Sequence, residues 1–436
     1  MPSASIVDDH QLRELEIRPS GADRRRSGQV AVIVIVLTGV AAGLSATLLG
    51  LLLHFIQHVA YDYSLDAVVS PESFLQGVTA APPLRRVSAL TTCGVVAGIG
   101  WWAVYRFGQP LVPIKAAVGK DVPGPQMPFL ATVAHVLLQI ATVALGPPLG
   151  RETAPREISA VLATWLSSRA GLSAEERRIL IACGAGAGLA AIYNVPLGGA
   201  LFTLEVLLGT FALKALIPAI ATSVVATLVA WGGLGDVRQF LVPPLEISPS
   251  LIAWSIVAGP VFGVSAYGFR AVTRVATGHT PQGWHRVPWC LAVFIGVGLL
   301  AMLFPQLPGN GKGPSQLGFD GDLAGNLALS LLALKALAIA ASLRAGAAGG
   351  LLTPSLTLGA LLATVFGGVW NLVFPNVPTA ALAIVGASAF LASSMNMPLT
   401  TIALMIEFTR IGHDLWIPIF LAVAGSVSSL YVMHRR

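Results

Sequence analysis

The sequence contains little charge. Only 11% of its 436 residues are Asp, Glu, Lys or Arg, whereas soluble domains carry about 25%. Hydrophobic residues make up 55% of the chain. This composition excludes an ordinary soluble domain, because most of the chain could not face water. It indicates a multi-pass protein of the all-α class that is integral to the cell membrane. The lipid bilayer is therefore an expected partner.

Cysteine is rare as well. The three cysteines, Cys93, Cys183 and Cys290, lie in apolar surroundings without Cys-x-x-Cys or Cys/His spacing. The sequence therefore offers neither a disulfide framework nor a metal site, and we expect the thiols to be small packing residues. No cofactor is expected. No nucleophile–base pair or phosphate-binding loop has the spacing of an active site, so a membrane-embedded enzyme is only a remote alternative.

Basic residues are concentrated beside the apolar segments. Arg24, Arg25 and Arg26 precede the first long apolar run, and Arg435 and Arg436 follow the last one. Since Lys and Arg near the ends of spans favour the cytoplasm, we expect both termini there, which requires an even number of crossings. The same placement argues against a nucleic-acid partner, because these charges adjoin hydrophobic segments.

Glycine and proline divide the apolar sequence into segments, several of which are shorter than the ~20 residues that cross a bilayer. Such interrupted segments are typical of broken helices, which occur only where the backbone lines a cavity or is buried in protein. The most polar break in mid-chain is 233–250. We therefore predict a cytoplasmic tail at 1–27, a first membrane repeat at 28–232, a linker at 233–250 and a second membrane repeat at 251–436.

The two halves share a motif. Asn-x-Pro-Leu occurs at 194–197 and again at 396–399, and a glutamate, Glu205 or Glu407, stands nine positions after each proline. This match indicates an internal repeat, and transporters built from inverted repeats place their site at the repeat interface. Two unrelated loops with a helix-starting proline are the alternative. Both glutamates lie near the ends of apolar helices, so we expect each to cap or pair at a cytoplasmic loop, and Glu205 is also a candidate proton relay.

Four ionisable residues stand between apolar stretches in GPPLGRETAPREISA, residues 146–160. They are Arg151, Glu152, Arg156 and Glu157. At mid-bilayer each charged residue would cost about 2.5–3.5 kcal/mol. The surrounding structure must therefore stabilise these charges or use them.

Three short segments place glycine and proline at an expected helix start: GRETAP at 150–155, GGLLTP at 349–354 and GQPLVP at 108–113. Converging helix N-termini present unpaired N–H groups and about half a positive charge each, which favours an anion. The carboxylate of Glu152 can occupy such a site and close a pathway that protonation or displacement would open. The alternative is a surface loop whose four charges are solvated.

The same segments resemble motifs of a known family. GRETAP resembles the Gly-Arg/Lys-Glu-Gly-Pro motif of the CLC chloride channel and transporter family, GGLLTP its Gly-x-Phe-x-Pro motif and GQPLVP, more loosely, its Gly-Ser-Gly-Ile-Pro motif. The resemblance covers roughly residues 30–430 and is to bacterial-type members without CBS domains. It implies a homodimer of tilted and broken helices, arranged in two inverted repeats, with one anion pathway in each subunit.

The resemblance also implies roles for particular residues. Glu152 matches the external gating glutamate, and Gly150 and Arg151 flank it near the outer end of the pathway. Leu351 and Leu352 match the positions whose backbone N–H groups coordinate the central anion.

Two positions depart from the family pattern. Pro110 falls where the family has an anion-coordinating serine, and a proline offers neither a hydroxyl nor an amide donor. Val206 aligns with the internal proton-handling glutamate, so coupling to protons by the usual route is not expected unless Glu205 substitutes. The resulting interpretation is glutamate-gated transport of a small anion, and chloride is the anion that we expect most. Fluoride/proton antiport is the alternative within transport, because some fluoride-transporting members lack the same serine and glutamate.

Overall fold

The computed structural model describes residues 21–63, 72–119 and 124–434. The basic side chains predicted to mark the two ends of the chain lie outside the described side chains, as does most of the predicted tail. Within the described ranges the fold is all-helical, and the one extended pairing is an isolated bridge between Gly150 and Gly350.

Each half of the chain supplies a series of helices. The first half contains α2 (Gly21–Tyr61), α3 (Phe74–Ala80), α4 (Pro83–Phe107), α5 (Ile114–Ala117), α6 (Phe129–Ala144), α7 (Thr153–Arg169), α8 (Ala174–Tyr193), α9 (Pro196–Phe202), the π-helical turn Thr203–Leu208 and α10 (Leu213–Leu234). The second half contains α11 (Pro249–Gly278), α12 (Arg286–Leu303), α13 (Lys312–Asp320), α14 (Gly325–Ala345), α15 (Leu352–Val373), α16 (Thr379–Met395), α17 (Pro398–Thr409) and α18 (Trp416–His434), with 3₁₀ turns at Gly283–His285 and His413–Leu415.

Many of these helices suit a bilayer. Eight helices in the described part of the chain are long and apolar enough to cross a membrane, and at most 50% of each apolar window is buried within the protein. On α10, for example, Leu213, Ile217 and Leu228 are exposed. Apolar side chains that face outward in this number need hydrocarbon around them rather than water. The chain is therefore an integral, multi-pass membrane protein.

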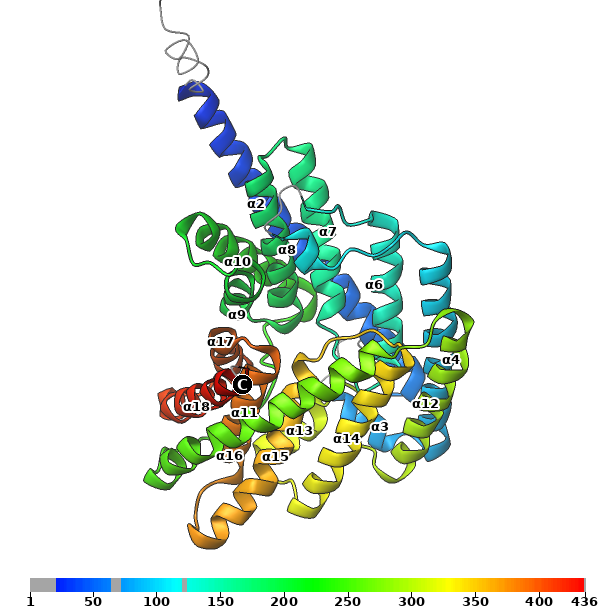
Figure 1. The fold of residues 1–436 in the computed structure, drawn as a ribbon, viewed down its shortest axis with the longest axis vertical. Coiled ribbons are helices and arrows are strands. Elements are labelled where there is room, and N and C mark those ends of the chain that lie inside the picture. Colours follow the sequence, from blue (N-terminus) through cyan, green and yellow to red (C-terminus); the bar gives the residue numbers. More distant parts are fainter. Residues whose placement is uncertain (1–20, 64–71, 120–123, 435–436) are drawn as a thin grey trace, which may run out of the picture.

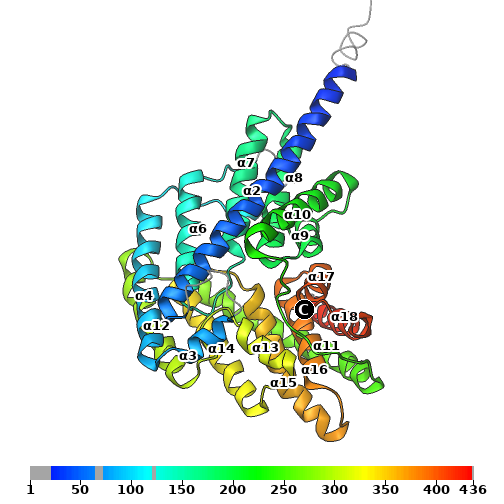
Figure 2. The same cartoon turned by 180° about the vertical axis from the view of Figure 1, so that it is seen from behind.

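The halves pack their helices in the same pattern. α7 packs on α8 as α15 packs on α16, and α2 contacts α8 and α10 as α11 contacts α16 and α18. Two further pairs join the halves: α4 packs along α12, and α9 packs on α17. Figures 1 and 2 show α4 and α12 together at one edge of the molecule, with α10, α17 and α18 toward the opposite edge.

Glycine allows the close approach of α4 and α12. A Cβ atom added at Gly94 would lie 2.9 Å from Leu291 Cα, and one at Gly98 would lie 2.8 Å from Val287 Cα. These glycines are four residues apart, so they lie on the same face of α4. Small residues at this spacing bring membrane helices into backbone contact, and here they join the first half to the second.

The repeated Asn-x-Pro-Leu motif has the same local geometry in both halves. Asn194 and Asn396 adopt the left-handed conformation, with φ of 58° and 54°, and so end α8 and α16. Pro196 and Pro398 then open α9 and α17, a position that suits proline because no hydrogen bond is lost. Neither helix is capped by the side chain of its own N-cap residue.

The uncapped start of α9 receives a carboxylate from the second half. Glu407 of α17 accepts hydrogen bonds from the N–H groups of Leu197, at 2.9 Å, and Gly198, at 2.7 Å. A carboxylate at this place satisfies two free donors and interacts favourably with the helix dipole.

The start of α17 receives a carboxylate from the first half in return. Glu205 accepts hydrogen bonds from the N–H groups of Leu399, at 3.0 Å, and Thr400, at 2.7 Å. The Thr400 hydroxyl donates a third, at 2.6 Å. The expectation that both matched glutamates cap or pair is therefore confirmed, whereas their position at a cytoplasmic loop stays a prediction. The exchange of partners between the halves is an addition to that expectation.

Replacing Glu407 by alanine should destabilise the protein, because the N–H groups of Leu197 and Gly198 lose their side-chain acceptor at the start of α9. We expect a loss of about 1–3 kcal/mol, measured as a lower unfolding temperature of the detergent-solubilised protein. Glu175→Ala is the control, because it removes an exposed carboxylate paired with Lys214 and should change the unfolding temperature little. Equal shifts of the unfolding temperature in the two variants would contradict a stabilising role for Glu407 at the start of α9.

Candidate anion site

Two helices begin next to each other inside the protein. The N–H group of Gly150 donates to the carbonyl of Gly350 at 2.7 Å, and the N–H group of Gly350 donates back at 2.8 Å. Gly150 lies three residues before the start of α7, and Gly350 lies two residues before the start of α15. This antiparallel pairing holds the two helix N-termini together, so two of the three predicted helix starts do converge.

The carboxylate of Glu152 lies at this junction. The residue is only 1% exposed. Its Oε1 atom accepts the backbone N–H of Leu352 at 2.8 Å, and its Oε2 atom accepts the hydroxyl of Tyr193 at 3.0 Å. The Tyr193 oxygen is also 2.9 Å from the hydroxyl oxygen of Thr353. The negative charge is thus placed at the positive end of α15, where it is stabilised without a salt bridge.

The paired glycines leave the space that the carboxylate fills. A Cβ atom added at Gly150 would lie within 2.7 Å of the Glu152 carboxyl carbon, and one added at Gly350 would overlap the carboxylate. Any larger residue at either position would push the side chain of Glu152 out of its place. The glycine that precedes each helix is therefore required by the position of the carboxylate.

The remaining charges of the segment are also stabilised by neighbours. The guanidinium carbon of Arg151 lies 5.3 Å from the centre of the Tyr193 ring, and that of Arg156 lies 4.4 Å from the centre of the Phe202 ring. Such cation–π contacts suit an arginine that is partly removed from water.

Glu157 forms a polar cluster on the other side of α7. Its Oε2 atom lies 2.8 Å from Nδ1 of His135 and accepts a hydrogen bond from Gln139, also at 2.8 Å. None of the four charges is therefore simply solvated, and the alternative of a solvated surface loop is wrong, most clearly for the buried Glu152.

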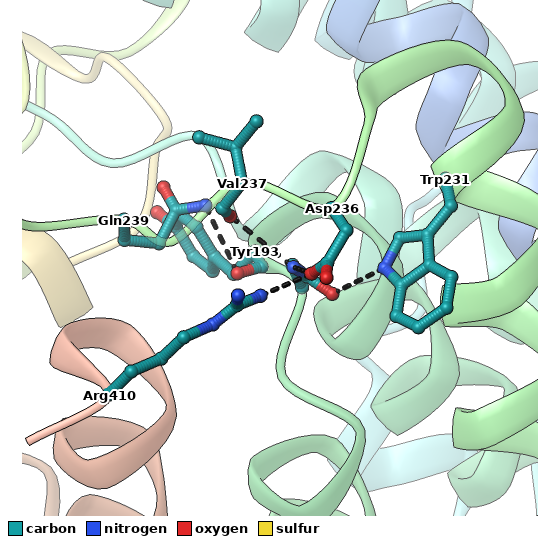
Figure 3. A network of polar contacts seen from close by, with 7 residues as sticks. Tyr193, Trp231, Asp236, Val237, Gln239 and Arg410 are labelled. Carbon is teal, nitrogen blue, oxygen red and sulfur yellow. Dashed lines mark hydrogen bonds and ion pairs between the residues drawn. The ribbon is translucent and has the colours of Figure 1, made fainter.

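The segment between α10 and α11 contacts residues of this site, and Figure 3 shows its Gln239 beside Tyr193. Gln239 donates to the carbonyl of Tyr193 at 3.1 Å and accepts from Arg151 at 3.4 Å. Asp236 accepts from Asn194 at 2.7 Å and forms an ion pair with Arg410, which follows α17. These hydrogen bonds, from Asn194 first and Arg410 second, hold the pKa of Asp236 below its ordinary value. The connecting segment thus fastens the two halves together next to Glu152.

The other predicted site residues are placed as follows. Leu352 supplies the amide that holds Glu152, whereas Leu351 precedes α15 and is half-buried. Pro110 is exposed in the stretch that leads into the four-residue α5, and α5 packs on α8. The third predicted helix start is thus a single turn rather than a helix, and the assignment of Pro110 to the anion site stays a prediction.

The internal positions lie elsewhere. Val206 is half-buried against the hydrophobic core, next to Glu205 with its three hydrogen bonds.

Tyr193 and Gln239 were missed by the sequence reasoning. Tyr193 directly precedes the first Asn-x-Pro-Leu motif, which was its one signal, while Gln239 lies in a polar stretch that gave none. The described residues contain no cluster of three or more His, Cys, Asp or Glu side chains that could hold a metal.

Comparisons with known proteins agree with this geometry. The family model described as "Voltage gated chloride channel" matches residues 93–429. The voltage-gated ClC-type chloride channel ClcB of Citrobacter koseri is 30% identical over 349 residues, which are 77% of this chain and 82% of that protein. ClcB of Escherichia coli is 28% identical over 348 residues, with the same coverage of 77% and 82%.

Solved structures share the fold. A slow cyanobacterial Cl⁻/H⁺ antiporter superimposes with a TM-score of 0.80 at 19% identity, over 93% of this chain and 95% of that one. A CLC-type fluoride/proton antiporter superimposes with a TM-score of 0.72 at 19% identity, over 95% and 98%. With the family model spanning most of the sequence, the chain belongs to the voltage-gated chloride channel, or CLC, family of anion channels and transporters.

Proposed function

We propose that this chain transports chloride across the membrane through a pathway that the carboxylate of Glu152 closes. One observation carries the proposal: the carboxylate is buried and is held by the Leu352 amide and the Tyr193 hydroxyl. Both donors are uncharged. They can therefore hold an anion without binding it so strongly that it cannot leave.

The gate works by competition for these donors. When Glu152 is ionised, its oxygen atoms occupy the Leu352 amide and the Tyr193 hydroxyl, and a chloride ion is excluded by both space and charge. Protonation removes the charge that α15 attracts, so the side chain can leave and chloride can take its place. Arg151 and Arg156 keep the local potential positive in both states. Gly150 and Arg151 flank this position, and the backbone at Leu351 and Leu352 lines it.

The assembly is part of the same proposal. The reciprocal glutamate caps and the antiparallel pairing of Gly150 with Gly350 support two repeats of inverted topology, at 28–232 and 251–436, because a two-fold axis in the membrane exchanges such contacts. Glu152 and its donors come from one chain, which supports one pathway in each subunit of the proposed homodimer. Both termini would then face the cytoplasm from the plasma membrane.

Transport by this chain should not be coupled to protons. Val206 has no group that binds a proton. Glu205 beside it has both carboxylate oxygens bound at the start of α17, so protonation would weaken a contact between the halves. The arrangement favours a structural role for Glu205 over a proton relay.

Fluoride/proton antiport is the second candidate. Pro110 lacks the hydroxyl and the amide N–H that a serine would offer to chloride, and one protein with the same fold is a CLC-type fluoride/proton antiporter. An efflux assay that compares chloride with fluoride separates the two functions.

Glu152→Gln should remove the pH response of transport, because glutamine imitates the protonated gate. In liposomes, chloride efflux by the native protein should rise as the pH falls, whereas the variant should be equally fast at neutral and acidic pH. Glu157→Gln is the matched control, since it lies on the same helix and its carboxylate bonds to His135 and Gln139 instead. If Glu152→Gln keeps the native flux and pH response, Glu152 is not the gate.

Gly350→Ala should open the pathway without changing Glu152 itself, because the added methyl group occupies the place of the carboxylate. Chloride efflux at neutral pH should rise to the level of Glu152→Gln, and the double variant should show no further increase. Gly368→Ala, within the α15 helix that Gly350 precedes, is the control, because its Cβ meets open space. Native gating in Gly350→Ala would refute the competition model.

An outward chloride gradient should not drive protons into vesicles that contain this protein. Chloride efflux and internal pH are recorded together, with and without a proton ionophore, and the measurement is repeated with fluoride. Chloride flux without proton movement is expected, because Val206 breaks the proton route. Proton uptake against its gradient during chloride flux would overturn uncoupled transport, and coupled flux with fluoride alone would establish the antiporter.

A further inference from the structure

A second positively charged site lies away from Glu152, where three helix ends meet. α12 packs on α4 and on α14, and its first residue, Arg286, lies against Tyr105 near the end of α4. Arg344 lies in the last turn of α14. Figures 1 and 2 show α4 and α12 at the edge opposite α10, α17 and α18. We call Tyr105, Arg286, Trp289 and Arg344 the α12 arginine site.

Arg286 is buried with unused hydrogen-bond donors. The residue is 8% exposed, and its guanidinium carbon lies 4.5 Å from the centre of the Tyr105 ring. Its Nη2 atom donates to the carbonyl of Pro281 at 3.3 Å. The buried Nε and Nη1 atoms have no acceptor among the described residues. Buried guanidinium donors normally have partners, so two unsatisfied ones indicate a missing acceptor.

Arg344 adds a second guanidinium group at the same turn of α12. Its guanidinium carbon lies 4.7 Å from the centre of the Trp289 ring, three residues after Arg286. Its buried Nη1 atom also lacks an acceptor among the described residues. The chain passes close to Arg286 just after Arg344, because a Cβ atom added at Gly346 would lie 2.9 Å from Arg286 Nε.

The local charge is not balanced by the protein. Arg286 opens an α-helix, where the free N–H groups already make the end positive, so its charge is unfavourable there. The ion pairs among the described residues involve Arg85, Lys214, Arg410 and His135, but neither arginine of this site. Neither arginine has an ion-pair partner among the described residues, so a bound anion would offset positive charge to which the start of α12 adds.

We propose that the α12 arginine site binds the phosphate of an anionic phospholipid. A phosphate has several oxygen atoms and can accept from both guanidinium groups and from the helix N-terminus at once. Exposed aromatic side chains surround the site: Trp284, Tyr105 and Trp289 are 62%, 51% and 46% exposed. Exposed tryptophan and tyrosine beside arginine are typical of the headgroup level of a bilayer. A lipid in the adjoining leaflet reaches this position from outside, with its acyl chains along α4 and α12.

Native mass spectrometry of the detergent-solubilised protein tests the site, with phosphatidylglycerol and phosphatidylcholine as probes. The native protein should retain phosphatidylglycerol in preference to phosphatidylcholine. Arg286→Gln and Arg344→Gln should each weaken phosphatidylglycerol binding by about tenfold, the effect of losing one charge-assisted contact. Arg274→Gln is the matched control, because this exposed arginine lies on α11 shortly before the chain enters α12; its binding should match the native protein.

Each other outcome decides against the proposal. Equal phosphatidylglycerol binding by the native protein and by Arg344→Gln would overturn it. Arg344 is the less buried of the two arginines, so this variant keeps the test available even if Arg286→Gln does not fold. Displacement of the lipid by millimolar inorganic phosphate would assign the site to a free anion instead. The native protein should also unfold at a higher temperature in phosphatidylglycerol than in phosphatidylcholine, and Arg344→Gln should not. These readouts measure lipid binding, so they succeed or fail independently of the proposed chloride transport.

Discussion

Helix N-termini leave free N–H groups that require acceptors, and this chain provides them as carboxylates from distant parts of its sequence. α9 is met by Glu407, α17 by Glu205 and α15 by Glu152. Free N–H groups are costly in hydrocarbon, and so is an isolated carboxylate. Bringing the two together removes both costs with one contact. The broken helices and the buried glutamates of this fold therefore depend on each other.

The three contacts differ in the number and kind of their donors. Glu205 accepts two backbone N–H groups and a hydroxyl, and Glu407 accepts two backbone N–H groups. Glu152 accepts one backbone N–H group and the hydroxyl of Tyr193. The first two bind residues of α9 and α17 and hold the halves together. The third has the fewest backbone donors and lies between two glycines, which agrees with the proposal that this carboxylate leaves its site when the pathway opens.

The sequence allowed some of this arrangement to be predicted because its signals were local. Glycine and proline around Glu152 predicted a helix start, and the equal spacing of Glu205 and Glu407 from their prolines predicted helix-end roles. The exchange of partners between halves could not be read locally, since it depends on pairing residues about 200 positions apart. The only signal for Tyr193 was its place directly before the first Asn-x-Pro-Leu motif, and that place does not reveal its contact with Glu152. The expected helix after Pro110 proved to be a single turn.

Because the buried carboxylates are used at helix ends, the buried arginines must be stabilised differently. Arg151, Arg156, Arg286 and Arg344 all lie over aromatic rings rather than against carboxylates. A ring face lowers the cost of burying a cation but accepts no conventional hydrogen bond and carries no net charge. Each of these arginines keeps a buried nitrogen without an acceptor among the described residues. The unsatisfied donors at both places support the two proposals, a mobile anion near Glu152 and a phosphate beside α12.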